Sequence, residues 1–285
     1  MKTILVTGSN GQLGQELQAL SAQYPQYHFF HFSRQELNIA DAAQVKEAFI
    51  KIKPQFCVNC AAFTAVDKAE TAPEAAFLIN ESGVDNLAAA CSLAGAKLIH
   101  ISTDYVFDGS GSVPYREDDA TNPLGVYGAS KLAGEKAILG RLPESVIIRT
   151  SWVYSIYGSN FVKTMVRLMH EKPSLNVVSD QWGSPTHAAD LAAAIMHIIE
   201  AAQWTPGIYH FSNDGVTNWH QFAEAIRSAI GSACTVSPIA TEQYPTPAAR
   251  PKYSVLSKEK ITDTFGVTLL PWQQSLDECL KKLAL

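Results

Sequence analysis

The chain has 285 residues, of which 47% are hydrophobic and 17% charged, and its formal net charge is −5 at pH 7. This composition is typical of a globular protein with one large domain or two coupled lobes, and it argues against a disordered chain. The negative net charge disfavours a broad nucleic-acid-binding surface, which needs clustered basic residues.

Targeting signals, disulfides and metal sites are not expected. Residues 1–6 form too short an apolar run for a signal peptide, and no stretch approaches the ~20 apolar residues of a membrane helix. Cys57 and Cys60 form a C-x-x-C pair, but they lie in an apolar run, FCVNCAA, typical of a buried strand. No second pair completes a zinc set, so we expect core thiols and a cytoplasmic location.

In the first half of the chain, predicted strands alternate with predicted helices. The strands are expected at 2–6, 28–32, 56–60, 97–102 and 145–150, and the helices at 15–20, 41–52, 74–94 and 129–139. This alternation predicts an α/β fold with a Rossmann-type doubly wound parallel sheet.

The pattern is looser in the second half. It predicts helices at 161–169, 188–202, 219–230 and 276–283, and strands at 176–178 and 207–211. We therefore expect residues 1–150 to form a dinucleotide-binding domain that also receives 175–203. Residues 151–285 should mainly form a smaller C-terminal α/β lobe that binds substrate.

A glycine-rich turn follows the first predicted strand. Gly8, Gly11 and Gly14 lie between that strand and a helix, with the spacing G-x-x-G-x-x-G. Glycine lets the backbone approach a pyrophosphate, and the helix N-terminus offers N–H groups and a positive dipole end. The alternative is a tight turn without a ligand.

Arg34 follows the second predicted strand, where such folds meet the adenosine ribose. An arginine there suits the 2′-phosphate of NADP, whereas an acidic residue suits the 2′-hydroxyl of NAD. Arg34 therefore favours NADPH, although NADH and a solvated surface arginine both remain open.

Tyr127 and Lys131 are four residues apart in a sequence with strong helix propensity, so they should share one face. A lysine ammonium one turn away should lower the pKa of the phenol and make it a better acid. Thr103 ends a predicted strand, where open α/β sheets bind ligands, and its hydroxyl could polarise the same carbonyl. Chance occurrence of Tyr-x-x-x-Lys on a surface helix is the alternative.

These motifs resemble the extended short-chain dehydrogenase/reductases, and most closely the group of dTDP-4-dehydrorhamnose reductases. The similar segments cover most of the chain: VTGSNGQLGQEL, VNCAAFTAVDKAE, ISTDYVFDG, PLGVYGASKLAGE, IRTSWVYS, NFVKTM, VVSDQWGSPT and YPTPAARP. The resemblance implies reduction of dTDP-4-dehydro-β-L-rhamnose with NADPH or NADH.

The resemblance also implies roles for individual residues. Tyr127 would donate the proton, Lys131 would hold the nicotinamide ribose, and Thr103 would help to fix the carbonyl. The cofactor would contact Gly8, Asn10, Gly11, Gln12, Leu13, Gly14, Arg34, Asn38, Ile39, Ala62, Phe63 and Thr64. The substrate would contact Thr103, Asp104 and Trp152, and Asn160, Phe161, Trp182 and Arg250 are further candidates for substrate contact.

Two departures from the group bear on binding. Asn38 stands where relatives usually have an aspartate that accepts a hydrogen bond from adenine, so we expect weaker anchoring without charge assistance. Some relatives dimerise around magnesium held by glutamates. Here Glu16 fits one such position but Ala189 occupies another, so bound magnesium is doubtful and we expect a monomer or a weak homodimer.

The substrate diphosphate and base need partners in the C-terminal half. Arg250 is the first choice among the cations there, ahead of Lys163, Arg167 and Lys252. Phe161 and Trp182 are candidates for the apolar slot that would take thymine, and both could equally belong to the core.

Two other functions remain open. A nucleotide-sugar dehydratase or epimerase of the same superfamily is the nearest rival. The sugar dehydratases have a glutamate after the aspartate of the Thr-Asp pair, but Tyr105 follows Asp104 here, which favours simple reduction. The other possibility is a non-catalytic NADP-binding module that resembles the regulatory β subunit of methionine adenosyltransferase.

Overall fold

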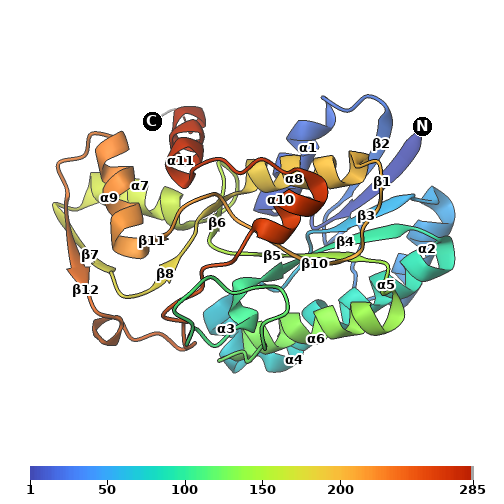
Figure 1. The fold of residues 1–285 in the computed structure, drawn as a ribbon, viewed down its shortest axis with the longest axis horizontal. Helices are drawn as coiled ribbons and strands as arrows, with labels where there is room; N and C mark the ends of the chain where they lie inside the picture. The colour runs from blue at the N-terminus through green and yellow to red at the C-terminus, as the bar shows by residue number, and fades with distance from the viewer. Residues whose placement is uncertain (284–285) are drawn as a thin grey trace.

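The computed structural model describes residues 1–283, and a six-stranded parallel sheet forms its centre (Figure 1). All neighbouring strands in the order β10-β5-β4-β3-β1-β2 run parallel. The strands are β1 (Lys2–Thr7), β2 (Tyr27–Phe32), β3 (Phe56–Asn59), β4 (Lys97–Thr103), β5 (Val146–Thr150) and β10 (Gly207–Phe211). The predicted doubly wound parallel sheet is confirmed.

Helices cover both faces of this sheet. One face carries α1 (Gln12–Ser21), α8 (Ala188–Glu200) and α10 (Glu259–Phe265), and the other carries α2 (Ala42–Ile52), α5 (Gly83–Ala94) and α6 (Val126–Arg141). The inner strands β1, β3, β4 and β5 are largely buried and mostly apolar because they lie between two helical layers, as in parallel sheets generally, whereas the edge strand β2 is only partly buried. Asp41 caps the N-terminus of α2, where its side chain accepts hydrogen bonds from the Ala43 and Gln44 nitrogens.

The strand order reverses between β1 and β3. The chain leaves β1 through α1 to β2 on one side, and it then crosses the other face through α2 to reach β3. In open α/β sheets, ligands bind beyond the carboxyl ends of the strands at this switch point. The fold therefore places a binding crevice between the glycine turn after β1 and the loop after β3.

The helix predicted over 74–94 is interrupted. Residues Pro73–Phe77 form α4, Leu78–Ser82 form a π-helical turn, and α5 follows directly. Asn80 lies in the π turn and is fully buried. Such bulges are frequent at functional sites, because they turn a side chain away from the regular helical spacing. A short helix, α3 (Val66–Thr71), precedes this segment.

A smaller lobe is built around β7 (Ser174–Val178) and β12 (Thr235–Ile239), which pair in parallel. Apolar residues of α7 (Phe161–Glu171), α9 (Trp219–Ala229) and α11 (Trp272–Lys282) form its core. The stretch 175–203, which we expected to join the nucleotide-binding domain, divides between the two parts. Helix α8 packs on α1, whereas β7 lies in the small sheet; β10 and α10 return to the central sheet.

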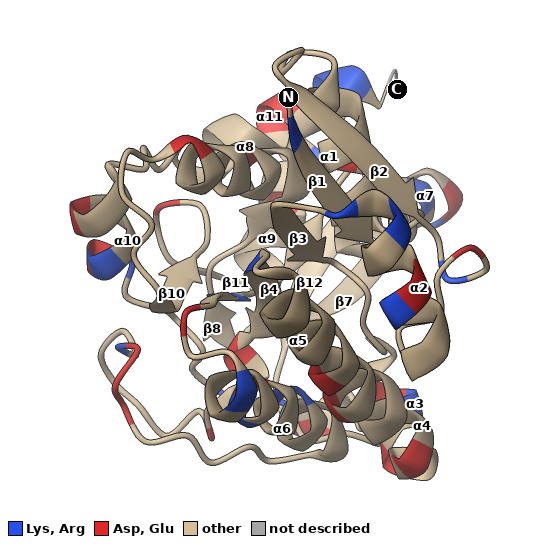
Figure 2. Ribbon diagram, turned by 90° about the vertical axis from the view of Figure 1, so that its right-hand side faces the viewer, with Lys and Arg blue, Asp and Glu red and all other residues tan. Residues whose placement is uncertain are grey.

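Short elements connect the lobe to the sheet. β6 (Val153–Tyr154) pairs with β9 (Thr186–His187), and β8 (Trp182–Gly183) pairs with β11 (Thr217–Asn218). Two 3₁₀ turns cover Asp104–Val106 and Thr241–Gln243. Among residues 1–283, no helix is both long enough and apolar enough to cross a bilayer. Figure 2 shows charges of both signs on outer helices such as α2 and α10.

Candidate active site

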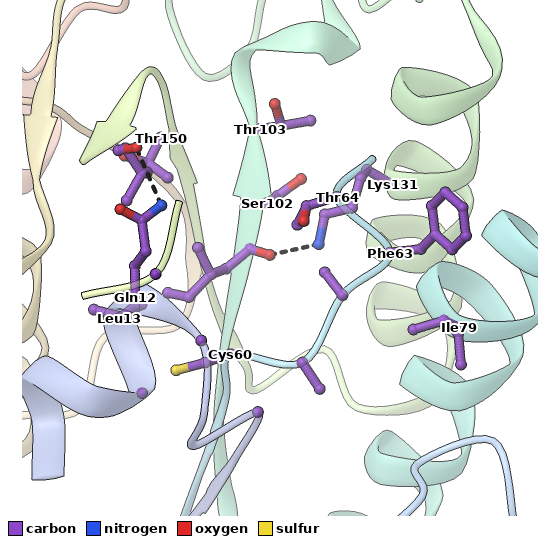
Figure 3. A pocket seen from close by; sticks show the side chains of 18 of the residues that line it. Gln12, Leu13, Cys60, Phe63, Thr64, Ile79, Ser102, Thr103, Lys131 and Thr150 are labelled. Carbon is purple, nitrogen blue, oxygen red and sulfur yellow. Dashed lines mark hydrogen bonds between the residues drawn. The ribbon is translucent and has the colours of Figure 1, made fainter. Parts of the chain in front are cut away.

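A cleft of about 790 Å³ opens at the switch point, beyond the carboxyl ends of β1, β3 and β4. All the residues that the sequence assigned to a dinucleotide line it, and so do Thr103, Asp104, Tyr127, Lys131 and Trp152. Figure 3 shows side chains that line this cleft. These residues, from six separate segments of the chain, thus meet in one cavity.

The glycine turn is shaped by close backbone contacts. Gly8 has a φ of +68°, and a Cβ there would lie 2.6 Å from the backbone nitrogen of Ala61. A Cβ on Gly14 would lie 2.4 Å from the carbonyl oxygen of Gly8. No side chain caps the N-terminus of α1 at Gly11, so the first N–H groups of the helix are free for an anion. This arrangement fits the pyrophosphate of a dinucleotide.

Asn80 holds the loop after β3 in place. Its side chain accepts a hydrogen bond from the Phe63 nitrogen (2.8 Å) and donates to the Phe63 oxygen (3.1 Å) and the Ser130 hydroxyl (3.0 Å). It therefore ties the loop of Ala62, Phe63 and Thr64 to helix α6. The sequence analysis did not assign Asn80; a lone amide in an apolar helix was the only signal.

Arg34, Asn38 and Ile39 line the part of the cleft beyond β2, where the sequence predicts the adenosine. Glu36 is turned away from this part of the cleft, because its carboxylate accepts hydrogen bonds from the nitrogen and the hydroxyl of Ser33. The side-chain oxygen of Asn38 accepts from the Ala40 nitrogen (3.2 Å), so the acceptor expected for adenine already has a partner within the chain.

Helix α6 includes both Tyr127 and Lys131, which confirms their predicted place on one helix. The Lys131 ammonium nitrogen, Nζ, lies 2.6 Å from the Ile101 carbonyl oxygen of β4, and Figure 3 shows the side chain reaching across from α6. The expected lowering of the Tyr127 pKa is wrong for this structure. Burial raises the Tyr127 pKa to about 12, against an opposing effect of the Thr103 hydroxyl. The Lys131 charge is directed toward β4 instead.

The pKa of Lys131 is also shifted. Only 2% of its surface is exposed, and burial lowers its pKa to about 8, against opposing effects of Glu135 and the Cys60 thiol. Cys57 is buried as expected, whereas Cys60 lines the cleft.

Thr103 and Asp104 follow β4 directly. The Thr103 hydroxyl donates to Asp104 Oδ1 (3.0 Å) and accepts from the Tyr105 nitrogen (3.2 Å), so its proton is directed to the neighbouring carboxylate. Among the residues described, the other carboxylate oxygen, Oδ2, is buried without a hydrogen-bond partner. Burial raises the Asp104 pKa to about 6. The site therefore holds an unsatisfied acceptor that suits a sugar hydroxyl.

Aromatic side chains also line the cleft. Trp152 has a φ of +49°, and its ring stacks on Trp219 with centroids 3.6 Å apart. The Tyr105 ring meets the Tyr127 ring edge-on at 5.6 Å. Tyr105 and Trp219 also line the cleft but were not assigned from the sequence, since aromatic residues outside a motif resemble core residues.

Four residues assigned to the substrate do not line the cleft. Asn160 caps α7 and donates to the side-chain oxygen of Gln12 (2.9 Å). Phe161 packs against Trp219 and Phe222 in the lobe core, which is the alternative left open for it.

Trp182 and Arg250 lie elsewhere on the lobe. Trp182 is 39% exposed and bonds through its backbone to Lys252. The Arg250 guanidinium pairs with Asp67 of α3 at 2.9 Å, and this pairing lowers the Asp67 pKa. The pair ties the segment before Pro251 to the first half of the chain. Glu16, the one candidate magnesium ligand, accepts a hydrogen bond from Ser155.

Comparison with known proteins agrees with this geometry. The family model described as the RmlD substrate binding domain matches residues 1–285. The chain belongs to this family.

Three relatives illustrate the match. The dTDP-4-dehydrorhamnose reductase of Salmonella typhimurium is 42% identical, over 98% of this chain and 97% of its own. The spore coat polysaccharide biosynthesis protein SpsK of Bacillus subtilis is 43% identical, over 99% and 98%. The crystal structure of dTDP-4-dehydrorhamnose reductase from Bacillus anthracis in complex with NADP superimposes with a TM-score of 0.94 at 40% identity, covering 99% of this chain and 100% of its own.

Proposed function

We propose that this chain is an NAD(P)H-dependent oxidoreductase that reduces the C4 keto group of dTDP-4-dehydro-β-L-rhamnose to give dTDP-L-rhamnose. The observation that carries the proposal is the meeting of Thr103, Tyr127 and Lys131 with the glycine turn in one cleft. Family membership over the full chain and reductases at about 42% identity support it.

In this reaction the nicotinamide, when bound, supplies a hydride to C4 of the sugar. Tyr127 donates its phenolic proton to the carbonyl oxygen, which becomes the hydroxyl of the product. General acid catalysis of this kind contributes ~100- to 10,000-fold. The raised pKa of Tyr127 keeps the phenol protonated at neutral pH, and reduction requires that form.

Thr103 and Asp104 orient the sugar in this proposal. The Asp104 oxygen without a partner accepts a hydrogen bond from a sugar hydroxyl, which offsets the cost of burying the carboxylate. Asp104 is the only carboxylate among the described residues that line the cleft. An elimination that needs an additional acid and base therefore has too few groups here, which supports reduction over dehydration.

We propose NADPH as the preferred cofactor. Arg34 lines the adenosine end of the cleft, while the nearby Glu36 carboxylate is engaged by Ser33. A guanidinium suits a 2′-phosphate, and hydrogen bonds to charged groups are worth ~1.5–3 kcal/mol.

We also propose that Arg250 binds the substrate diphosphate. This requires the guanidinium to exchange its Asp67 partner for phosphate oxygens, or to bind both at once through its five donors. Trp152 and Trp219 line the sugar side of the pocket.

The test is NADPH oxidation, followed by absorbance, with dTDP-4-dehydrorhamnose as the substrate and NADH run in parallel. We expect stoichiometric consumption of the reduced cofactor, with a lower KM for NADPH. Arg34→Gln should raise the KM for NADPH by at least ~10-fold and leave that for NADH unchanged. Tight NADPH binding without consumption would instead identify a binding module, and catalytic recycling of the cofactor would identify an epimerase.

A further inference from the structure

A buried chain of polar side chains leads from β1 to Lys131. The Thr7 hydroxyl donates to Asn59 Oδ1 (2.7 Å), Asn59 Nδ2 contacts His100 Nδ1 (2.9 Å), and His100 Nε2 lies 3.3 Å from Lys131 Nζ. Thr7, Asn59 and His100 are each at most 1% exposed. The chain crosses three adjacent strands, β1, β3 and β4, beneath the cleft.

The direction of this chain is fixed at Asn59. The backbone N–H of Ala61 points at Asn59 Oδ1 (3.0 Å), and a backbone N–H can only donate. The side-chain amide is therefore oriented with its NH₂ group toward His100. Because that NH₂ group donates, His100 Nδ1 must accept and carries no proton.

His100 is a neutral imidazole. Burial holds its pKa well below the usual range, in agreement with an Nδ1 that accepts a hydrogen bond. A neutral imidazole has one proton, and with Nδ1 as the acceptor this proton lies on Nε2, the atom that faces Lys131. An ammonium has only donors, so it cannot accept this N–H, whereas a neutral amine can accept it with its lone pair.

We propose that Asn59 and His100 set the protonation state of Lys131 by presenting an N–H donor to Nζ, which favours the neutral amine over the ammonium. His100 is thus a positioning residue that acts through Lys131. Nζ then accepts from His100 and donates to the Ile101 oxygen.

Other groups act on Lys131 as well. Glu135, one turn further along α6, and the Cys60 thiol after β3 both raise its pKa, but Glu135 is paired with Arg149 of β5 at 2.8 Å. Tyr127 lies one turn earlier on α6, and Asp104 acts on Tyr127 rather than on Lys131. Nζ contacts the Ile101 backbone oxygen and His100 Nε2. Only at His100 can a single side-chain substitution nearby exchange the hydrogen-bond donor that faces Nζ for an acceptor.

The consequence rests on the proposed function. Because burial already lowers the Lys131 pKa to about 8, this bias toward the amine increases the fraction of Lys131 that does not draw the proton off Tyr127, and the phenol keeps its proton for the ketone. During reduction one proton moves from Tyr127 to the sugar oxygen, and the phenolate takes one back from solvent. The Asn59–His100 pair thus helps to keep Tyr127 in the protonated form that reduction requires.

Nuclear magnetic resonance tests this without turnover. In protein labelled with ¹⁵N-histidine, with the His100 signal assigned from a His100→Gln variant, we expect a proton on Nε2 and none on Nδ1 near neutral pH. In protein labelled with ¹³C-lysine, Lys131 should titrate well below the other lysines. A proton on Nδ1 of wild-type His100, or a doubly protonated ring, would overturn the proposal.

Asn59→Asp should reverse the polarity. The new carboxylate accepts a hydrogen bond, so the His100 proton should lie on Nδ1 and leave Nε2 with a lone pair. This lone pair faces Lys131 Nζ and favours the ammonium. The Lys131 pKa should therefore rise by ~1–3 units. Thr7→Val removes one donor to Asn59 but leaves the Ala61 N–H in place, so its spectra should match wild type. A Lys131 titration that stays in place or falls in Asn59→Asp contradicts the proposal, whatever the reductase assay gives.

Discussion

The two sides of the cleft are built differently. On the nucleotide side, the wall is made of backbone and small side chains at consecutive positions, held by contacts such as that between Gly8 and Ala61. On the sugar side, Asp104, Trp152 and Trp219 come from separate segments and are large, charged or aromatic. The nucleotide side thus depends on the close approach of main chains, and the sugar side on the desolvation and stacking of side chains.

The difference has an electrostatic consequence. The glycine turn presents N–H groups and residues 8–14 include no titratable side chain, whereas the sugar side holds four groups with shifted pKa values, Asp104, Tyr105, Tyr127 and Lys131. Perturbed values gather where chemistry is carried out. Substitutions on the sugar side should therefore change turnover and pH dependence, and substitutions on the nucleotide side should change binding and stability.

The largest effect is expected for Tyr127→Phe, which removes the proton donor. We expect kcat to fall by ~100- to 10,000-fold, with little change in the Kd of NADPH. Steady-state kinetics measure kcat, and fluorescence titration measures the Kd of NADPH. Tyr154→Phe is the matched control, because the Tyr154 hydroxyl is buried in the lobe with no hydrogen-bond partner among the described residues. Normal turnover in Tyr127→Phe would rule out the role of this phenol.

Asp104→Asn should change stability in a pH-dependent way. Asp104 has a pKa raised to about 6 in the folded state, so above pH 6 the folded protein carries a buried charge that the unfolded chain solvates freely. The asparagine variant avoids this cost. Its free energy of unfolding at pH 7 should be up to ~3 kcal/mol higher than that of the wild type, since each pKa unit is worth ~1.4 kcal/mol.

This gain should shrink as the pH falls through 6 and vanish below about 4, where the carboxyl is neutral in both states. Urea unfolding at several pH values measures it. A gain that is independent of pH would show that the Asp104 charge is not its cause. The same variant should bind the sugar more weakly, since it has lost an ionised acceptor.

Gly14→Ala tests the nucleotide side. A methyl group there would lie 2.4 Å from the Gly8 oxygen and 2.6 Å from Ser9 Cα, so backbone must shift. We expect a loss of ~1–3 kcal/mol in the free energy of unfolding and much weaker NADPH binding. In the control Gly140→Ala, a helical glycine with nothing within 4 Å of the added methyl, we expect a gain of ~0.5–1 kcal/mol. Equal effects in the two variants would contradict the account of the turn.

The sequence predicts the sheet and the nucleotide side well, because both leave local signals. The β-branched runs, the glycine spacing and the helix carrying Tyr127 and Lys131 each read directly from neighbouring residues, and the structure places them as expected. The π turn at Asn80 was not predictable, since a break in helical spacing arises from packing against the loop after β3.

The smaller lobe was harder to predict, because its packing also depends on contacts between residues that are far apart in the sequence. Phe161 and Trp182 were assigned by residue type, and whether an aromatic side chain lines a cavity or a core depends on contacts distant in sequence. The Tyr127 pKa was misjudged because helical spacing fixes the face that a lysine shares, but not the strand carbonyl that its ammonium contacts.

The central claim is that this cleft delivers a hydride and a proton to one ketone. The most direct measurement uses NADPH deuterated at the transferable position, with dTDP-4-dehydrorhamnose and the wild-type chain, followed by product NMR. The account predicts one deuterium at C4 of dTDP-L-rhamnose for each NADPH oxidised. Deuterium that stays in the cofactor, or a sugar product without label at C4, would contradict it.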